Sequence, residues 1–208
     1  MPRKAGADIR GLALDRKFEA TRSFALAAGC VLGPSFLALQ KIPIPTPLYL
    51  FGLAAGGFLV YQGRELLGLA ARADQGARGE EEIGKILKQL PSGWRTEYNR
   101  PVSGVGDVDV IVHSPQGKAW VIDVKSHGGY IYASQGQLKR KLGKNSVPLE
   151  KDFLAAAKKQ AVLVRDADNL KWVIPVICFS SATVQVKQPV NGVHVVQKSE
   201  LLNFLMTS

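Results

Sequence analysis

The chain opens with two apolar segments separated by a short proline-rich stretch. Residues 23–40 and 46–62 contain no charged residue, and Lys41 is the single charge between them. At about 1.5 Å per helical residue the first segment spans roughly 27 Å, close to the ~30 Å hydrocarbon core of a bilayer. The pattern therefore predicts a hairpin of two transmembrane helices within residues 23–69.

Two other interpretations of this apolar block were weighed. A helical hairpin buried in a soluble core is disfavoured because so few charges leave no polar face for water. A cleavable signal peptide is disfavoured because a second apolar run follows the first and no Ala-x-Ala site separates them. Residues 1–22 form a basic segment, and Arg64, Arg72 and Arg78 follow the block. The positive-inside rule then predicts that both termini are cytoplasmic.

From residue 63 onward charged and polar residues return, and the periodicity changes. Residues 70–78 are small and polar, which predicts a linker, and residues 79–208 alternate between helical and strand-like patterns. The predicted order is helix, strands, helix, two strands and helix, which indicates an α/β domain. The expected helices are 79–90, 149–165 and 199–205, and the expected strands are 95–99, 108–113, 118–125, 129–133, 172–179 and 193–196.

The net charge of +10, with an isoelectric point near 9.7, suggests a polyanionic partner, either nucleic acid or an anionic membrane surface. Residues 1–22 carry six Lys or Arg against three acids, which fits membrane orientation. Twenty cations against fourteen acids follow residue 62, so the support for nucleic-acid binding is modest. The two cysteines exclude a disulfide scaffold or a zinc-finger array.

Two apolar strands with acidic residues flank a turn, Ser114-Pro-Gln-Gly117, which predicts an antiparallel hairpin. In the second strand Asp123 and Lys125 project from the same face. If positions whose numbers sum to 232 pair, Asp109 lies opposite Asp123, with Cβ atoms roughly 4.5–5.5 Å apart. A slip of one residue would turn Asp109 to the other face.

Two carboxylates this close repel each other, and a divalent cation would neutralise them. Oxygen ligands suit Mg²⁺ or Mn²⁺, and a bound ion can polarise a phosphate and activate water. The alternative is that Asp109 and Asp123 are half-exposed strand residues and that Lys125 merely pairs with one of them. An isolated D-x-K triplet is common enough by chance to keep this alternative open.

The order of motifs resembles the nuclease-related domain (NERD) family of restriction-endonuclease-like nucleases. The resemblance covers roughly residues 76–206. It rests on Gly79-Glu80 with Ile83 and Leu87, Val108-Asp109, Asp123-Val-Lys125, Gly128, Lys144-Asn145, Pro148, Gln160 and the strand 173–179. It implies a restriction-endonuclease-like core, a mixed central sheet flanked by helices, and a PD-(D/E)xK nuclease site.

The resemblance also implies roles for individual residues. Asp109 and Asp123 would hold the metal, Lys125 would support the water and the transition state, and Glu80 would be a third acid near the metal. Gln160 would be a further participant in catalysis. The sequence departs from the family in having Asp123 where Glu is usual, and in a longer helix start before Gln160.

Basic residues lie downstream of the predicted site. We predict that they contact a nucleic-acid backbone, although a solvated cationic face would have the same composition. His127, two residues after Lys125, is expected to reach a phosphate. The cations are Lys139, Arg140, Lys141, Lys144, Lys158 and Lys159.

The sequence thus predicts a membrane-anchored, Mg²⁺- or Mn²⁺-dependent nuclease that acts on DNA, or alternatively on RNA, with its domain in the cytoplasm. The main rival is a catalytically inactive module that tethers nucleic acid or a protein partner to the membrane. A third possibility is a membrane protein whose domain serves only assembly. The sequence does not indicate an oligomeric state.

Overall fold

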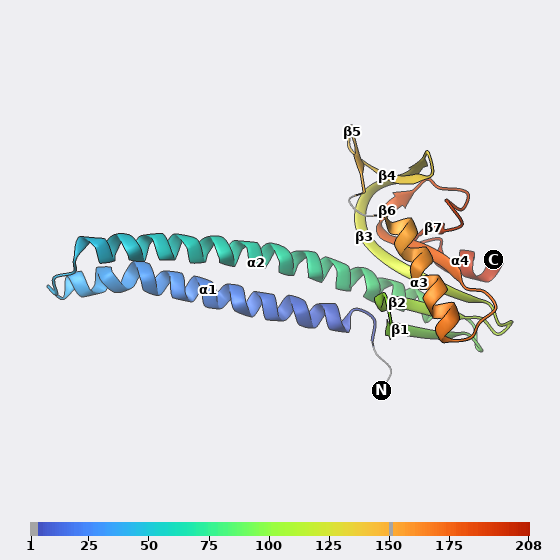
Figure 1. Ribbon diagram of the computed structural model, residues 1–208, viewed down its shortest axis with the longest axis horizontal. Coiled ribbons are helices and arrows are strands. Elements are labelled where there is room, and N and C mark those ends of the chain that lie inside the picture. The colour runs from blue at the N-terminus through green and yellow to red at the C-terminus, as the bar shows by residue number, and fades with distance from the viewer. Residues whose placement is uncertain (1–3, 150–151) are drawn as a thin grey trace. The chain divides into compact units, whose positions relative to one another are not determined.

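The computed structural model describes residues 4–149 and 152–208 (Figure 1). The chain divides into two compact units. Residues 8–75 form a helical unit, and residues 76–208 form an α/β unit together with the first residues of the chain, up to Ala7. The sequence placed the N-terminal residues in a separate basic segment, 1–22, so their membership of the α/β unit is a finding of the structure.

The helical unit is a hairpin of α1 (Ala7–Leu39) and the first part of α2 (Thr46–Leu87). Two glycines of α2 allow the helices to approach closely. A Cβ atom at Gly52 would lie 2.7 Å from the carbonyl oxygen of Cys30, and one at Gly56 would lie 2.7 Å from Cγ2 of Val31. The small-xxx-small spacing of these glycines therefore marks the contact between the helices.

Of the helices in the described part of the chain, α1 alone is long and apolar enough to cross a membrane. Only one of the two expected spans therefore meets this criterion, and the second span stays a prediction. Tyr49, Gly56, Gly57 and Gln62 lower the mean hydropathy of the second apolar segment, and Arg64 and Glu65 follow it directly.

Residues 70–78, expected as a linker, are helical and belong to α2, which continues to Leu87. Alanine and arginine are abundant in this stretch and are among the better helix formers, so its small and polar composition favours continuation of the helix. The amphipathic pattern after residue 79 is confirmed, since Ile83 and Leu87 are buried in the core. One helix thus contributes to both units.

The α/β unit is built on a seven-stranded mixed sheet. Strands β1 to β5 pair antiparallel in sequence order, and β6 pairs parallel with both β3 and β7. The strands are β1 (Arg95–Val102), β2 (Gly106–His113), β3 (Ala119–Ser134), β4 (Gln137–Leu142), β5 (Asn145–Pro148), β6 (Ile174–Val184) and β7 (His194–Gln197).

The central strand β3 is sixteen residues long and strongly bent (Figure 1). Its first half pairs with β2 and its second half with β4, while β6 pairs along both halves. The register against β6 shifts between Lys125 and Gly128, which marks a bulge. Bulges increase local twist and often lie beside functional sites. The sequence predicted two separate strands here because Ser126, His127 and Gly128 interrupt the apolar pattern.

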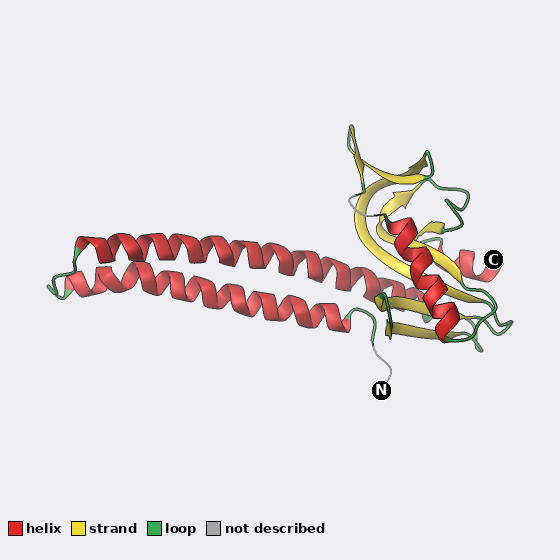
Figure 2. Cartoon of the chain, in the orientation of Figure 1, coloured by secondary structure: helices red, strands yellow, loops and turns green. Residues whose placement is uncertain are grey.

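Helices cover both faces of the sheet (Figure 2). The end of α2 and α4 (Leu201–Thr207) pack on one face through Ile83, Leu87, Leu201 and Leu205. Helix α3 (Phe153–Ala167) packs on the other face through small and branched side chains that include Ala157, Ala161 and Val164. The predicted mixed sheet flanked by helices is confirmed.

Candidate functional site

The predicted hairpin and its register are confirmed. Val110 lies opposite Ile122 and His113 opposite Ala119, so each pair sums to 232. Asp109 and Asp123 are the next opposing positions in this register. The turn closes as its sequence predicts, since the Gly117 N–H donates to the Ser114 carbonyl at 3.1 Å and Gly117 has a φ of +82°.

Asp123 and Lys125 form an ion pair near the bulge of β3. The Lys125 amine donates to Oδ1 of Asp123 at 2.7 Å, and the Asp123 side chain is only 4% exposed. The second carboxylate oxygen, Oδ2, is buried and has no hydrogen-bond partner among the described residues. A buried carboxylate oxygen without a donor is costly, and it is the kind of atom that binds a cation.

Asp109 lies beside this pair and is held by the main chain of β3. The Val124 N–H donates to Oδ2 of Asp109 at 2.8 Å. The protein surroundings of this half-buried carboxyl raise its pKa to about 8, chiefly by desolvation and then by the negative charges of Asp123 and Glu80. The Val124 N–H and the Lys125 amine act in the opposite direction. Such a site favours either a proton or a metal ion on the paired carboxyls.

Glu80 lies in α2 and is buried, with 4% of it exposed. Its Oε2 accepts a hydrogen bond from the Gly6 N–H at 3.0 Å. The segment before α1 therefore docks on the helix that carries Glu80. The sequence did not predict this contact, because the donor is a main-chain N–H group, which every residue except proline carries. Glu80 acts on Asp109 electrostatically, since its charge helps to raise the pKa of Asp109.

The donor set fits a divalent cation bound by two carboxylates. Within the described ranges, no three His, Cys, Asp or Glu side chains gather closely enough to hold a metal ion by themselves. Mg²⁺ is commonly bound by one or two protein carboxylates, with water and substrate phosphates as its other ligands. Asp109 and Asp123 meet this requirement, and a ligand role for Glu80 stays a prediction.

The first turn of α3 adds an aromatic residue that the sequence did not single out. The Lys125 amine lies 4.9 Å from the centre of the Phe153 ring, a cation–π distance. The His127 ring lies 5.5 Å from the same ring. Lys125 and His127 therefore lie on one side of the strand, and a phosphate contact by His127 stays a prediction.

Gln160 lies on α3, beside a cavity of about 510 Å³ that Lys159 and the β1–β2 turn at Gly104 and Gly106 also line. Its Oε1 is buried and has no hydrogen-bond partner among the described residues. No hydrogen bond joins Gln160 to Asp123 or Lys125 in the described part of the chain. Its participation in catalysis stays a prediction.

The predicted basic residues fall on β4, on the turn that follows it and on α3. Lys139, Arg140 and Lys141 belong to β4, which the sequence did not predict as a strand. Adjacent strand residues face opposite sides of a sheet, so these three cannot share one face. Lys144 lies in the turn before β5, and Lys158 and Lys159 are exposed on α3. Contact of these residues with a nucleic acid stays a prediction.

Comparison with known proteins bears on what this site does. No curated protein and no solved structure matches the chain. The family model of the nuclease-related domain, NERD, matches residues 75–180, which is half of the chain and includes Glu80, Asp109, Asp123, Lys125 and Gln160. The chain therefore belongs to the nuclease-related domain family.

Proposed function

We propose that this protein is a membrane-anchored, metal-dependent nuclease that hydrolyses phosphodiester bonds in DNA. The observation that carries the proposal is the arrangement of Asp109, Asp123 and Lys125 within the nuclease-related domain. Two opposing carboxyls, one of them with a buried and unpaired oxygen, lie beside an amine. The composition favours a polyanionic substrate, and six of the ten excess positive charges fall after residue 62.

Each residue has a role in this proposal. Asp109 and Asp123 would hold Mg²⁺ or Mn²⁺, which when bound polarises the phosphate and lowers the pKa of the attacking water. The Lys125 amine, fixed at 2.7 Å from Asp123, would orient the water and balance charge on the phosphate as the bond breaks. The negative charge of Glu80, which favours a proton on Asp109, would favour a bound metal ion there for the same reason, and Gln160 would contact the substrate.

The metal requirement gives the direct test of this function. The full-length protein in neutral detergent, incubated with single-stranded and duplex DNA and RNA, should cleave DNA with Mg²⁺ or Mn²⁺. Cleavage should stop in excess EDTA and return when the metal is restored, because the carboxylates need the ion to act. Fragment lengths on gels measure the result. DNA binding that is equal with EDTA and with Mg²⁺, without cleavage under any condition, would instead support the inactive tether.

Membrane anchoring is the second part of the proposal. Large apolar side chains of both helices are exposed to the surroundings, including Leu32 and Phe36 of α1 and Phe51 and Phe58 of α2, each more than 60% exposed. Exposed apolar surface of this kind marks contact with a membrane or a partner. We propose that α1 and the apolar start of α2 insert as a hairpin whose two ends lie on the cytoplasmic side.

A reporter that senses its compartment tests this topology. Fused after Pro45, in the turn between the helices, the reporter should read as non-cytoplasmic, because the basic flanks of the hairpin are retained on the cytoplasmic side. The same reporter after Ser208 should read as cytoplasmic and serves as the control. A cytoplasmic signal from both fusions would show that the hairpin does not cross the membrane.

A further inference from the structure

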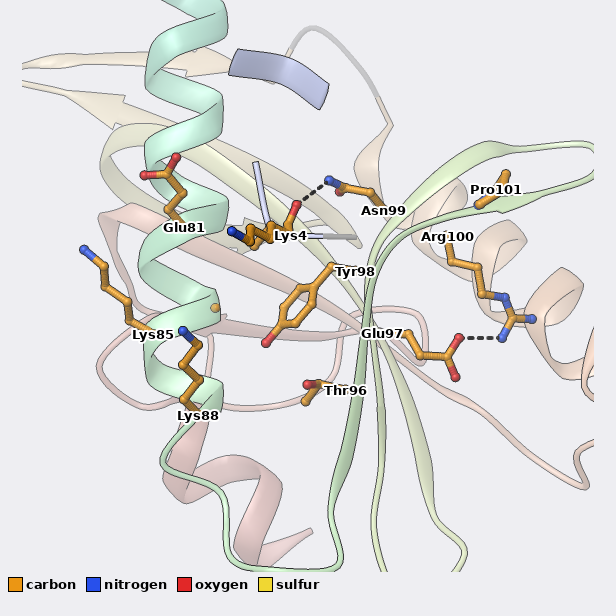
Figure 3. A pocket seen from close by; sticks show the side chains of 12 residues that line it. Lys4, Glu81, Lys85, Lys88, Thr96, Glu97, Tyr98, Asn99, Arg100 and Pro101 are labelled. Atoms are coloured by element: carbon orange, nitrogen blue, oxygen red, sulfur yellow. Dashed lines mark hydrogen bonds and ion pairs between the residues drawn. The ribbon is translucent and has the colours of Figure 1, made fainter. Parts of the chain in front are cut away.

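A second cavity of the α/β unit lies outside the carboxylate site, between the end of α2 and the edge strand β1. It has a volume of about 640 Å³, within the range of roughly 300–1,000 Å³ typical of ligand pockets. Lys85 and Lys88 line it from α2, Thr96 and Tyr98 line it from β1, and Lys4 lines it from the docked N-terminal segment. Figure 3 shows the Tyr98 ring between the strand and the lysines.

The charges of this pocket suit an anion, because four cations, Lys4, Lys85, Lys88 and Arg100, line it against two acids, Glu81 and Glu97. Lys85 and Lys88 are three residues apart, so they share a face of α2. Both side chains are exposed, and neither forms a hydrogen bond or ion pair with a described residue. Arg100, also in the lining, is already bound through two hydrogen bonds to Asp168 and one to Glu97. Lys85 and Lys88 are therefore cations of α2 that remain available for a phosphate, and Lys4 is a third lysine of the lining.

Tyr98 gives the pocket an aromatic surface. Its ring packs beside Gly84 of α2, where a Cβ atom would lie 3.7 Å from Cε1 of the tyrosine. The half-buried ring is thus supported from one side while it lines the cavity. Proteins that bind single strands combine a positive groove with aromatic rings on which bases stack. A base in a duplex is already stacked on its neighbours and cannot use such a ring.

The pocket adjoins the carboxylate site through one residue of its wall. In the register of β1 and β2, Arg100 pairs with Val108 and Tyr98 with Val110, so Asn99 is the position opposite Asp109. Asn99 is 5% exposed, has a φ of +48°, and donates from Nδ2 to the Lys4 carbonyl at 3.3 Å. Neighbouring strands lie about 4.8 Å apart, so Asn99, which lines the pocket from β1, lies on the strand next to the one that carries Asp109.

We infer that this pocket binds an unpaired nucleotide of the substrate strand, with its base on Tyr98 and its flanking phosphates on Lys85 and Lys88. The choice of nucleic acid as ligand rests on the proposed nuclease function. The inference adds that the preferred substrate has a single-stranded stretch within reach of Asp109 and Asp123, such as an end, a flap or a loop.

Binding without cleavage tests this inference. The full-length protein in neutral detergent and EDTA is titrated against a fluorescein-labelled oligothymidylate and against a duplex of the same length, with anisotropy as the readout. Tyr98→Ala should weaken single-strand binding about tenfold and leave duplex binding unchanged. Tyr98→Phe, which keeps the ring, should bind like the wild type.

The lysines provide a second and independent measurement. In the Lys85→Gln/Lys88→Gln variant, the slope of log affinity against log salt for the single strand should fall by about 1.4, the value for two lost phosphate contacts. The matched control Lys171→Gln/Lys187→Gln removes the same charge from exposed positions outside the pocket and should leave the slope unchanged. All four lysines are exposed, so these variants are expected to fold.

The outcomes separate this inference from the proposed function. Single-strand affinity that is unchanged in both the Tyr98→Ala and the lysine variants would overturn it, even if the protein cleaves DNA. Equal weakening of single-strand and duplex binding by Tyr98→Ala would also overturn it, because stacking would then not be the cause. If the Tyr98 and lysine variants weaken single-strand binding but the protein never cleaves DNA, the inferred nucleotide pocket would be supported and the proposed nuclease function would be refuted.

Discussion

Replacement of Asp123 by asparagine is expected to reduce metal-dependent cleavage by more than about 100-fold while the α/β unit stays folded. Asparagine has nearly the same shape and keeps an oxygen for the Lys125 amine, which donates to Asp123 at 2.7 Å. It lacks the negative charge that a cation requires at the buried and unpaired Oδ2. The measurement is the initial rate of DNA cleavage at saturating Mg²⁺ or Mn²⁺. Asp123→Ala should lose as much activity.

Lys125→Ala should also abolish cleavage, but with a different effect on stability. Without the amine, the carboxylate of Asp123 is buried without its counter-ion, which should lower the free energy of unfolding by up to about 3 kcal/mol. This value lies at the low end of the range for buried pairs because the Lys125 side chain is 23% exposed. Asp123→Asn leaves no buried carboxylate, and Lys125 can turn toward water in that variant.

All three tryptophans of the chain, Trp94, Trp120 and Trp172, lie in the α/β unit. Their fluorescence during thermal unfolding therefore reports on this unit within the full-length protein. Lys171→Ala, at an exposed lysine outside the site, is the control for both activity and stability. Cleavage at wild-type rates by both Asp123→Ala and Lys125→Ala would show that the catalytic site lies elsewhere.

The features that the sequence predicted well are those set by local chemistry. The turn at Ser114 to Gly117 and the alternation of apolar residues on either side of it determine the register of β2 and β3. That register is sufficient to bring Asp109 and Asp123 together. The α/β class follows from the order of strand and helix patterns, whereas the mixed sheet flanked by helices was what the family resemblance implied.

The features that the sequence did not predict depend on contacts between distant residues or on strands without an apolar pattern. Strands β4 and β5 are rich in charged and polar residues, and they form because each strand pairs with a neighbour. The hydrogen bond between Gly6 and Glu80 joins residues 74 positions apart. The aromatic contact of Lys125 with Phe153 depends on where α3 crosses the sheet, which composition does not reveal.

The stability of the α/β unit should fall as the pH rises from about 4 to about 8, and Asp109 should account for a large part of that fall. Its pKa is raised from 3.8 to about 8 in the folded protein. Between these values the folded protein keeps a proton that the unfolded chain has lost, so the stability contributed by this proton decreases with pH. Above pH 8 both states are ionised, and this contribution is lost.

Asp109→Asn removes this titration and should flatten the pH profile. Asparagine keeps an oxygen acceptor for the Val124 N–H, so the variant is expected to fold. The stability of the variant relative to wild type should rise by about 3 kcal/mol between pH 4 and pH 8.5, a value set below the full linkage estimate because Asp109 is only half-buried. Melting curves followed by tryptophan fluorescence measure this difference. Parallel profiles for wild type and variant would show that the pKa of Asp109 is not raised in the folded protein.

Melting temperatures measured across the same pH range also report metal binding, without any substrate. A cation at Asp109 and Asp123 must displace the proton from Asp109, so Mg²⁺ should raise the melting temperature of the wild type more at pH 8.5 than at pH 5. This pH-dependent stabilisation should disappear in Asp109→Asn and in Asp123→Asn, because each variant removes one of the two charges. Glu81→Gln, which removes a carboxylate on α2 next to Glu80, is the control and should respond to Mg²⁺ like the wild type. A Mg²⁺ effect that persists in both aspartate variants would place the metal at other residues.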